Sequence, residues 1–152
     1  MNTTFDPEVF LAQQHTGSLD TRVPPLPEAE YPALIDNVEL REVNFRDGGK
    51  GLALNVMCLV EGPEVKEACG VPSKRVRYNF LLDLAPDGSL DMSNSKNLRL
   101  GRLREAIGQN TERPWSFLDL KGQPVKVRVK HTPDKNDPEV VYDEVASVTA
   151  LA

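Results

Sequence analysis

Strict alternation of apolar and basic residues between positions 124 and 131 is the feature of this sequence that most constrains its fold. Three valines, Val125, Val127 and Val129, take every second position, and a cation stands at each position between and after them. Successive side chains of a β-strand point to opposite faces of a sheet, so this pattern predicts a strand with one buried and one basic face. The chain must therefore contain other strands that cover the valines.

Four other segments have the period of a strand, and one has the period of a helix. The expected strands cover residues 33–43, 52–61, 74–84, 124–131 and 140–148. Leu100, Leu103 and Ile107 recur at helical spacing, which predicts a helix that begins near Asn94 or Ser95 and ends at Gly108. The alternation of the first strand slips around residues 36 and 37, as expected where a long strand bulges to serve both sides of a small barrel.

The order of three strands, one helix and two strands is typical of the oligonucleotide/oligosaccharide-binding (OB) barrel. We therefore predict a mainly β fold: a five-stranded OB-type barrel with one helix between strands 3 and 4. At 152 residues the chain fits one such domain preceded by an arm with a short helix. The expected division is an N-terminal arm at residues 1–30 and an OB-like barrel domain at residues 31–152.

The arm combines a short helix with a proline-rich extension. Asp6 and Pro7 form a helix start, with an N-cap acceptor followed by proline at the first helical position. The helix should end near residues 15–17, and four prolines stiffen residues 20–32. Neither part has enough apolar residues to fold alone, so any order should come from docking through Phe5, Val9 and Phe10. We expect the arm to dock on its own barrel or on a second copy, which would make a homo-oligomer.

Charge is unevenly distributed along the chain. The formal net charge of -5 argues against a polyanionic partner for the protein as a whole. From Lys96 to Lys130, however, nine basic residues stand against three acidic ones. Charges act over a Debye length of roughly 8 Å at physiological salt, so a local basic face still attracts a polyanion. A solvated surface of mixed charge is the alternative.

No motif in the sequence predicts catalysis, a metal site or a cofactor. The chain lacks a nucleophile elbow, a Walker loop, an HExxH motif and a dinucleotide-binding glycine pattern. Cys58 in an apolar strand and Cys69 in a loop have neither CxxC spacing nor a nearby histidine pair. No apolar run approaches the roughly 20 residues that span a bilayer, and the polar start lacks an export signal. We therefore expect no enzyme, no cofactor and no membrane contact, and a location inside the cell.

Cations and aromatic side chains suited to nucleic acid recur on the predicted strands and loops. Cations bind phosphates and flat side chains stack on bases. Trp115, which follows Pro114 in a loop, is the main stacking candidate, and its alternative role is to cap the barrel end beside Phe117. The alternative for each cation is that it lies on a strand face that contacts only water. The predicted nucleic-acid-binding residues are Arg46, Lys50, Arg75, Arg77, Trp115, Lys126, Arg128 and Lys130.

The remaining aromatic residues divide into core and surface candidates. Tyr78 and Phe80 share the apolar face of the third strand, so we expect both in the core. Further candidates for base stacking are Tyr31, Phe45, Phe117 and Tyr142.

Four segments carry a resemblance to a known family. They are the proline-rich lead into residues 31–35 (YPALI), the strand at 76–83 (VRYNFLLD), the helix at 100–108 (LGRLREAIG) and the segment 119–127 (DLKGQPVKV). In this overall pattern, from about Tyr31 to Val148, the chain resembles the OB-fold single-stranded-DNA-binding proteins of tailed bacteriophages. The resemblance implies a binding module without catalysis that acts in phage DNA replication or recombination, in the cytoplasm of the infected host cell.

Two hypotheses of different class follow from these observations. The first is a protein that binds single-stranded DNA with little sequence preference. The second is a phage virion or assembly protein whose β-barrel and N-terminal arm serve only protein–protein contacts. Binding of an oligonucleotide at several salt concentrations separates the two, because only the first involves release of counterions from a phosphate backbone.

Overall fold

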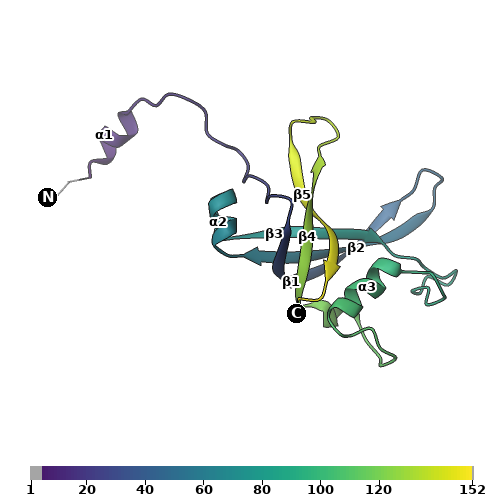
Figure 1. The fold of residues 1–152 in the computed structure, drawn as a ribbon. Helices are drawn as coiled ribbons and strands as arrows, with labels where there is room; N and C mark the ends of the chain where they lie inside the picture. The colour runs from purple at the N-terminus through teal and green to yellow at the C-terminus, as the bar shows by residue number, and fades with distance from the viewer. Residues whose placement is uncertain (1–4, 152) are drawn as a thin grey trace.

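The chain folds into five strands and several short helices, seen here in a computed structural model that describes residues 5–151 (Figure 1). In chain order these are α1 (Pro7–Ala12), β1 (Glu30–Asn44), β2 (Lys50–Glu61), α2 (Pro63–Cys69), β3 (Ser73–Leu81), α3 (Leu98–Ala106), the 3₁₀ helix η1 (Phe117–Leu120), β4 (Pro124–Pro133) and β5 (Val141–Thr149). The prediction of a mainly β fold with a helix between the third and fourth strands and a short N-terminal helix is confirmed.

The five strands form one mixed sheet that closes into a ring. Around the ring the order is β1, β2, β3, β5 and β4, and β4 pairs again with β1. All neighbouring strands are antiparallel except β3 and β5, which run parallel and share one register pair, Arg77 with Glu144. The two strands with basic outer faces, β3 and β4, are therefore separated by β5.

Alternation places the core inside the ring, as the sequence predicts. The three valines of β4 are at most 2 % exposed. Tyr78 and Phe80 of β3 are also buried, and their rings pack with centroids 5.0 Å apart. The slip in β1 is a register shift between Ile35 and Asn37, and β1 pairs with β4 through its first residues and with β2 through the rest. This bulge lets one strand serve both sides of the ring.

The connections around β3 are more ordered than expected. Residues 63–69 form α2 rather than an irregular loop, with Pro63 at the start and Gly70 as C-cap at φ 75°. Glycine adopts this left-handed conformation without steric cost, so it ends the helix there. Cys69 is consequently a buried helical residue, and its assignment to a loop was wrong. The helix predicted from Asn94 or Ser95 begins later, at Leu98.

The first part of the arm lies away from the ring (Figure 1). Asp6 caps α1, as predicted, by accepting a hydrogen bond from the Glu8 N–H at 3.0 Å. The helix buries no residue, and Phe5, Val9 and Phe10 are all exposed. These three side chains therefore do not anchor the arm on its own ring, which corrects the prediction for docking within one chain.

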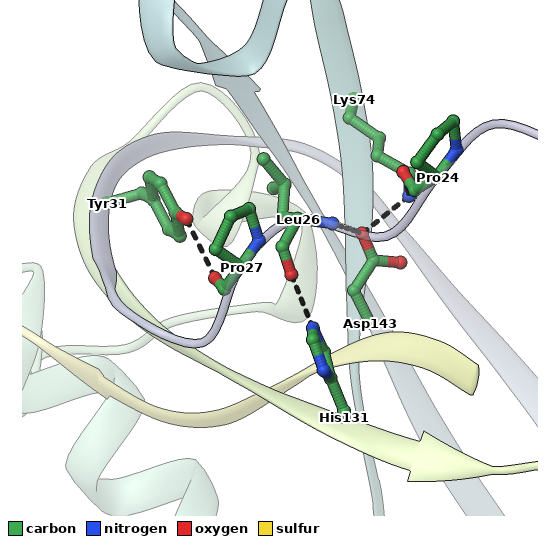
Figure 2. A network of polar contacts seen from close by, with 7 residues as sticks. All are labelled: Pro24, Leu26, Pro27, Tyr31, Lys74, His131 and Asp143. Carbon is green, nitrogen blue, oxygen red and sulfur yellow. Dashed lines mark hydrogen bonds and ion pairs between the residues drawn. The ribbon is translucent and has the colours of Figure 1, made fainter. Parts of the chain in front are cut away.

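Leu26 anchors the arm instead, with its side chain fully buried in the core. Its N–H donates to Asp143 Oδ2 (2.8 Å), and its carbonyl accepts from His131 Nε2 (2.6 Å). Figure 2 shows that Lys74 joins this network, because its Nζ contacts both the Asp143 carboxylate (2.6 Å) and the Pro24 carbonyl (2.8 Å). The ring thus holds the arm through Pro24 and Leu26, and the Arg22 guanidinium lies over the Tyr142 ring of β5 at 5.9 Å.

Candidate functional site

The outward side chains of β1, β2 and β3 form a surface of mixed polar and apolar residues, which we call the β1–β3 face. Strand register sets two rows across it: Glu39, Asn55 and Asn79 in one, and Asn37, Met57 and Arg77 in the next. Asn55 lies at the centre, and its Oδ1 is buried without a hydrogen-bond partner among the described residues. A buried polar atom without a hydrogen-bond partner costs about 1–3 kcal/mol.

Arg77 gives the β1–β3 face an available positive charge. It is exposed and forms no ion pair with any residue between positions 5 and 151. The neighbouring Arg75 differs, because its Nε lies 2.6 Å from the Asp36 carboxylate. Both arginines line a pocket of about 450 Å³ beside Tyr142, Asp143 and Glu144 of β5. The structure therefore brings together two of the predicted cations, one of them already paired.

The loop between β1 and β2 adds an aromatic ring to the edge of this face. A Cβ placed on Gly51 would lie 2.7 Å from the Phe45 ring, closer than real Cβ contacts, so glycine is what lets the ring lie against the strand. Phe45 remains 41 % exposed. Arg46 lies exposed in the same loop, whereas Lys50 contacts Glu42 at 3.3 Å. The loop thus offers one ring and one cation to a ligand.

A groove of about 520 Å³ continues the β1–β3 face toward α3. Asn97 closes the connection after β3 onto the strand end, because Asp83 N–H donates to its Oδ1 (2.8 Å) and its own N–H donates to Asp83 Oδ2 (2.7 Å). This loop sets Leu98 and Arg99 opposite Arg41 of β1 across the groove. Arg41 and Arg99 are both exposed and, like Arg77, form no ion pair within residues 5–151.

The predicted cations of β4 lie on a separate part of the ring, which we call the β4 face. Lys126 and Arg128 both contact the Glu30 carboxylate of β1, at 3.8 Å and 3.3 Å. Lys130 is exposed and is the register neighbour of Glu144 on β5. Because β5 separates β4 from β3, the structure does not join the predicted cations into one basic surface.

Trp115 lies apart from both faces, in the segment between α3 and η1. Its ring is half-buried, packs edge-on against Phe117 at 5.4 Å, and carries the Arg104 guanidinium over one face at 3.8 Å. The predicted neighbour Phe117 is thus confirmed. Tyr31 cannot stack on a base, because it is buried and donates to the Pro27 carbonyl at 2.7 Å (Figure 2). Of the aromatic candidates, Phe45 and Tyr142 are the most exposed, at 41 % and 43 %.

The list of predicted binding residues omits four residues that the structure places on or beside the β1–β3 face. They are Arg41, Asn55, Asn79 and Arg99. Asn55 and Asn79 stand at outward positions of their alternating strands, so periodicity alone locates them. Arg99 lies next to Leu100 in the sequence, and nothing local indicates that its side of the helix borders the strand face.

Two comparisons with known proteins found no match. No protein-family model matches the chain, and no curated protein matches it. Within residues 5–151 no helix is both long and apolar enough to cross a bilayer. The same residues contain no cluster of three or more histidine, cysteine or acidic side chains arranged to hold a metal ion.

Proposed function

We propose that the protein binds single-stranded DNA on the β1–β3 face, with little sequence preference. The observation that carries this proposal is the strand order β1, β2, β3, β5, β4 with a helix between β3 and β4. This is the arrangement of an OB-type barrel, in which the outward side of strands 2 and 3 and the loops that flank it bind oligonucleotides. The chemistry of the β1–β3 face is therefore the evidence that bears most on function.

Side chains on this face suit a single strand better than a duplex. Arg77, Arg41 and Arg99 offer cations that form no ion pair with any residue between positions 5 and 151, and Glu144 of β5 is the register neighbour of Arg77. Phe45 against Gly51 of β2 and Tyr142 on β5 beside Arg75 and Arg77 offer exposed rings, and unpaired bases stack on such rings. Asn55 and Asn79 offer amides that accept or donate at a base edge. In a duplex the bases are already stacked and paired, so the rings find no partner.

The proposed role in phage replication or recombination rests on the resemblance described above. A module of this kind coats a transient single strand, and phosphate contacts supply most of the affinity. The net charge of -5 belongs to the whole chain, whereas a ligand responds to the charges within a Debye length, and the proposed face carries Arg41, Arg77 and Arg99 together with Glu39.

Oligonucleotide binding at several salt concentrations tests the proposal. We expect a fluorescently labelled oligo-dT strand to bind more tightly than the matching duplex, with log affinity falling linearly against log salt. Lys66 is exposed on α2, so Lys66→Gln removes one positive charge away from the proposed face and serves as the control. A salt-independent signal, or no binding at low salt, would reject DNA binding.

The arm supports the second candidate function, a virion or assembly protein. α1 presents Val9, Phe10 and Leu11 to solvent on a segment that precedes the arm residues in contact with the ring, Arg22, Pro24 and Leu26. Removing residues 1–20 leaves Leu26 in place and should lower the mass in light scattering if the helix docks on a second copy. An unchanged mass would remove the argument for an arm-mediated homo-oligomer.

A further inference from the structure

Arg104 is a buried cation that the fold leaves without an anion. Its side chain belongs to α3, and the residue is only 4 % exposed. No carboxylate of residues 5–151 lies within 4.0 Å of its guanidinium. Buried arginines are almost always paired, because the desolvation of an isolated charge is costly. Burial also lowers the pKa of Arg104, because desolvation disfavours the charged form of the guanidinium.

The groups that do contact Arg104 are neutral. Its Nη2 donates to the Gln109 carbonyl, and its Nη1 lies 3.5 Å from Asn110 Oδ1. The guanidinium stacks on Trp115, which fixes its plane. Its Nε is buried and has no hydrogen-bond partner within the described chain. A fixed plane with an unused donor is the geometry in which arginine recognises an oxyanion.

A pocket of about 580 Å³ opens beside this side chain, between the end of α3 and η1. Arg113 and Lys121 line it and are exposed, so three cations border one cavity. Asp119 is the acidic residue of the lining, and its Oδ2 accepts the Ser116 N–H at 2.9 Å as the cap of η1. One carboxylate, already engaged in a cap, leaves the cavity with an excess of positive charge.

We propose that this pocket binds the phosphate group of a nucleotide. Three cations favour a multiply charged oxyanion over a single carboxylate, and the buried guanidinium strengthens that attraction because the local dielectric is low. Trp115 and Leu118 add apolar surface to the same cavity, which suits the base attached to the phosphate. The site is distinct from the β1–β3 face, and its existence does not depend on the proposed strand binding.

Titration with small ligands tests this site on the full chain. Inorganic phosphate and thymidine 5′-monophosphate should each bind saturably, measured by calorimetry and by the emission of the single tryptophan, Trp115. Thymidine without phosphate should bind at least about tenfold more weakly, because it lacks the charge-assisted hydrogen bonds. Equal binding of thymidine and its monophosphate would overturn the proposal, as would no binding of either phosphate-bearing ligand.

Variants at the exposed cations give a test that does not depend on refolding a buried site. Arg113→Gln and Lys121→Gln should each weaken thymidine monophosphate binding by several-fold, and the double variant by about tenfold or more. Lys66→Gln removes the same charge on α2, far from α3 in Figure 1, and should leave the affinity unchanged. If all three variants bind alike, the pocket is not the site. Arg104→Lys, checked for folding by circular dichroism, should weaken binding further because lysine lacks the planar fork.

Two further ligands identify the source of the phosphate and separate this site from strand binding. The first test compares the affinities of two dinucleotides, pTpT with a terminal 5′-phosphate and TpT without one. Tighter binding of pTpT would indicate that the pocket takes a strand end. Equal affinities would indicate that it takes a free nucleotide. Arg77→Gln should leave mononucleotide affinity unchanged while it lowers oligo-dT affinity. A failure of oligo-dT binding alone would therefore reject the β1–β3 proposal and leave the phosphate site standing.

Discussion

β3 and β4 have the same alternation of apolar and basic residues, yet their cations meet different surroundings. On β4, Lys126 and Arg128 share the exposed Glu30 carboxylate of the adjacent β1. On β3, Arg77 has no such partner within residues 5–151, while Lys74 is held by the largely buried Asp143. A strand's own sequence thus determines which side chains point outward, and the neighbouring strand determines whether their charge is available to a ligand.

The largest expected effect is the difference in stability lost when the buried ion pair at β3 and the exposed ion pair at β4 are each broken. Asp143→Asn leaves the Lys74 ammonium buried without an anion, so we expect the free energy of unfolding to fall by about 3 kcal/mol. Urea denaturation followed by circular dichroism measures it. Glu30→Gln is the matched control at the β4 face and should cost less than about 1 kcal/mol, since exposed pairs contribute little. Equal losses would contradict the contrast between the two strands.

Affinity for single-stranded DNA should separate Arg77 from Arg128. We expect Arg77→Gln to weaken oligo-dT binding about tenfold at low salt, and to reduce the salt slope by about 0.7, the loss of one phosphate contact. Arg128→Gln should change the affinity by less than about twofold, because the Glu30 carboxylate 3.3 Å away offsets part of this charge. Fluorescence anisotropy with a labelled strand measures both. Should Arg128→Gln be the more damaging substitution, the strand follows the β4 face.

A smaller effect is expected when the carboxylate at β4 is neutralised. Glu30→Gln leaves Lys126 and Arg128 without their anionic partner, so any long-range contribution of these cations should raise oligo-dT affinity by no more than about threefold. The same anisotropy assay at low salt detects it, with Lys66→Gln as the charge-change control of opposite sign. A rise beyond tenfold would mean that β4 contributes directly to binding.

The smallest effect concerns β5, the strand between the two. Tyr142 Oη donates to Asp134, and this hydrogen bond holds the pKa of the Asp134 carboxyl below its usual value. Because the Asp134 pKa is lower in the folded than in the unfolded chain, the ionised carboxylate stabilises the folded state. This contribution is fully present above the unfolded pKa, near 4, and is lost as the pH falls through the folded pKa. Tyr142→Phe should therefore raise the Asp134 pKa in an NMR titration and remove this part of the acid dependence. An unchanged pKa in the variant would assign the shift to the loop backbone.

Periodicity was sufficient to predict the inside and outside of the strands but not their partners. The burial of Tyr78 and Phe80 followed from alternation alone, as did the bulge near Asp36. The pairing of Arg128 with Glu30 did not, because those residues are far apart in sequence and meet only when β4 closes the ring on β1. Long-range register of this kind has no local signal in one sequence.

Two misses had signals that were present but weak. Gly62, Pro63 and Gly70 bracket α2 with a proline start and a glycine end, yet seven residues are too few for a helical period to stand out. Arg104 follows Leu100 by four positions, so helical spacing puts it on the same side as the buried leucine. Arginine is usually exposed, but packing against Trp115 buries this side chain.

Anchoring the arm at Leu26 makes α1 a tethered ligand rather than a free peptide. The exposed residues from Gln13 to Thr21 span at most about 30 Å when extended. A helix confined to such a radius has an effective concentration in the millimolar range near the ring. A partner that binds α1 is therefore delivered to the neighbourhood of whatever the ring has bound, and a weak apolar contact is sufficient to keep it there.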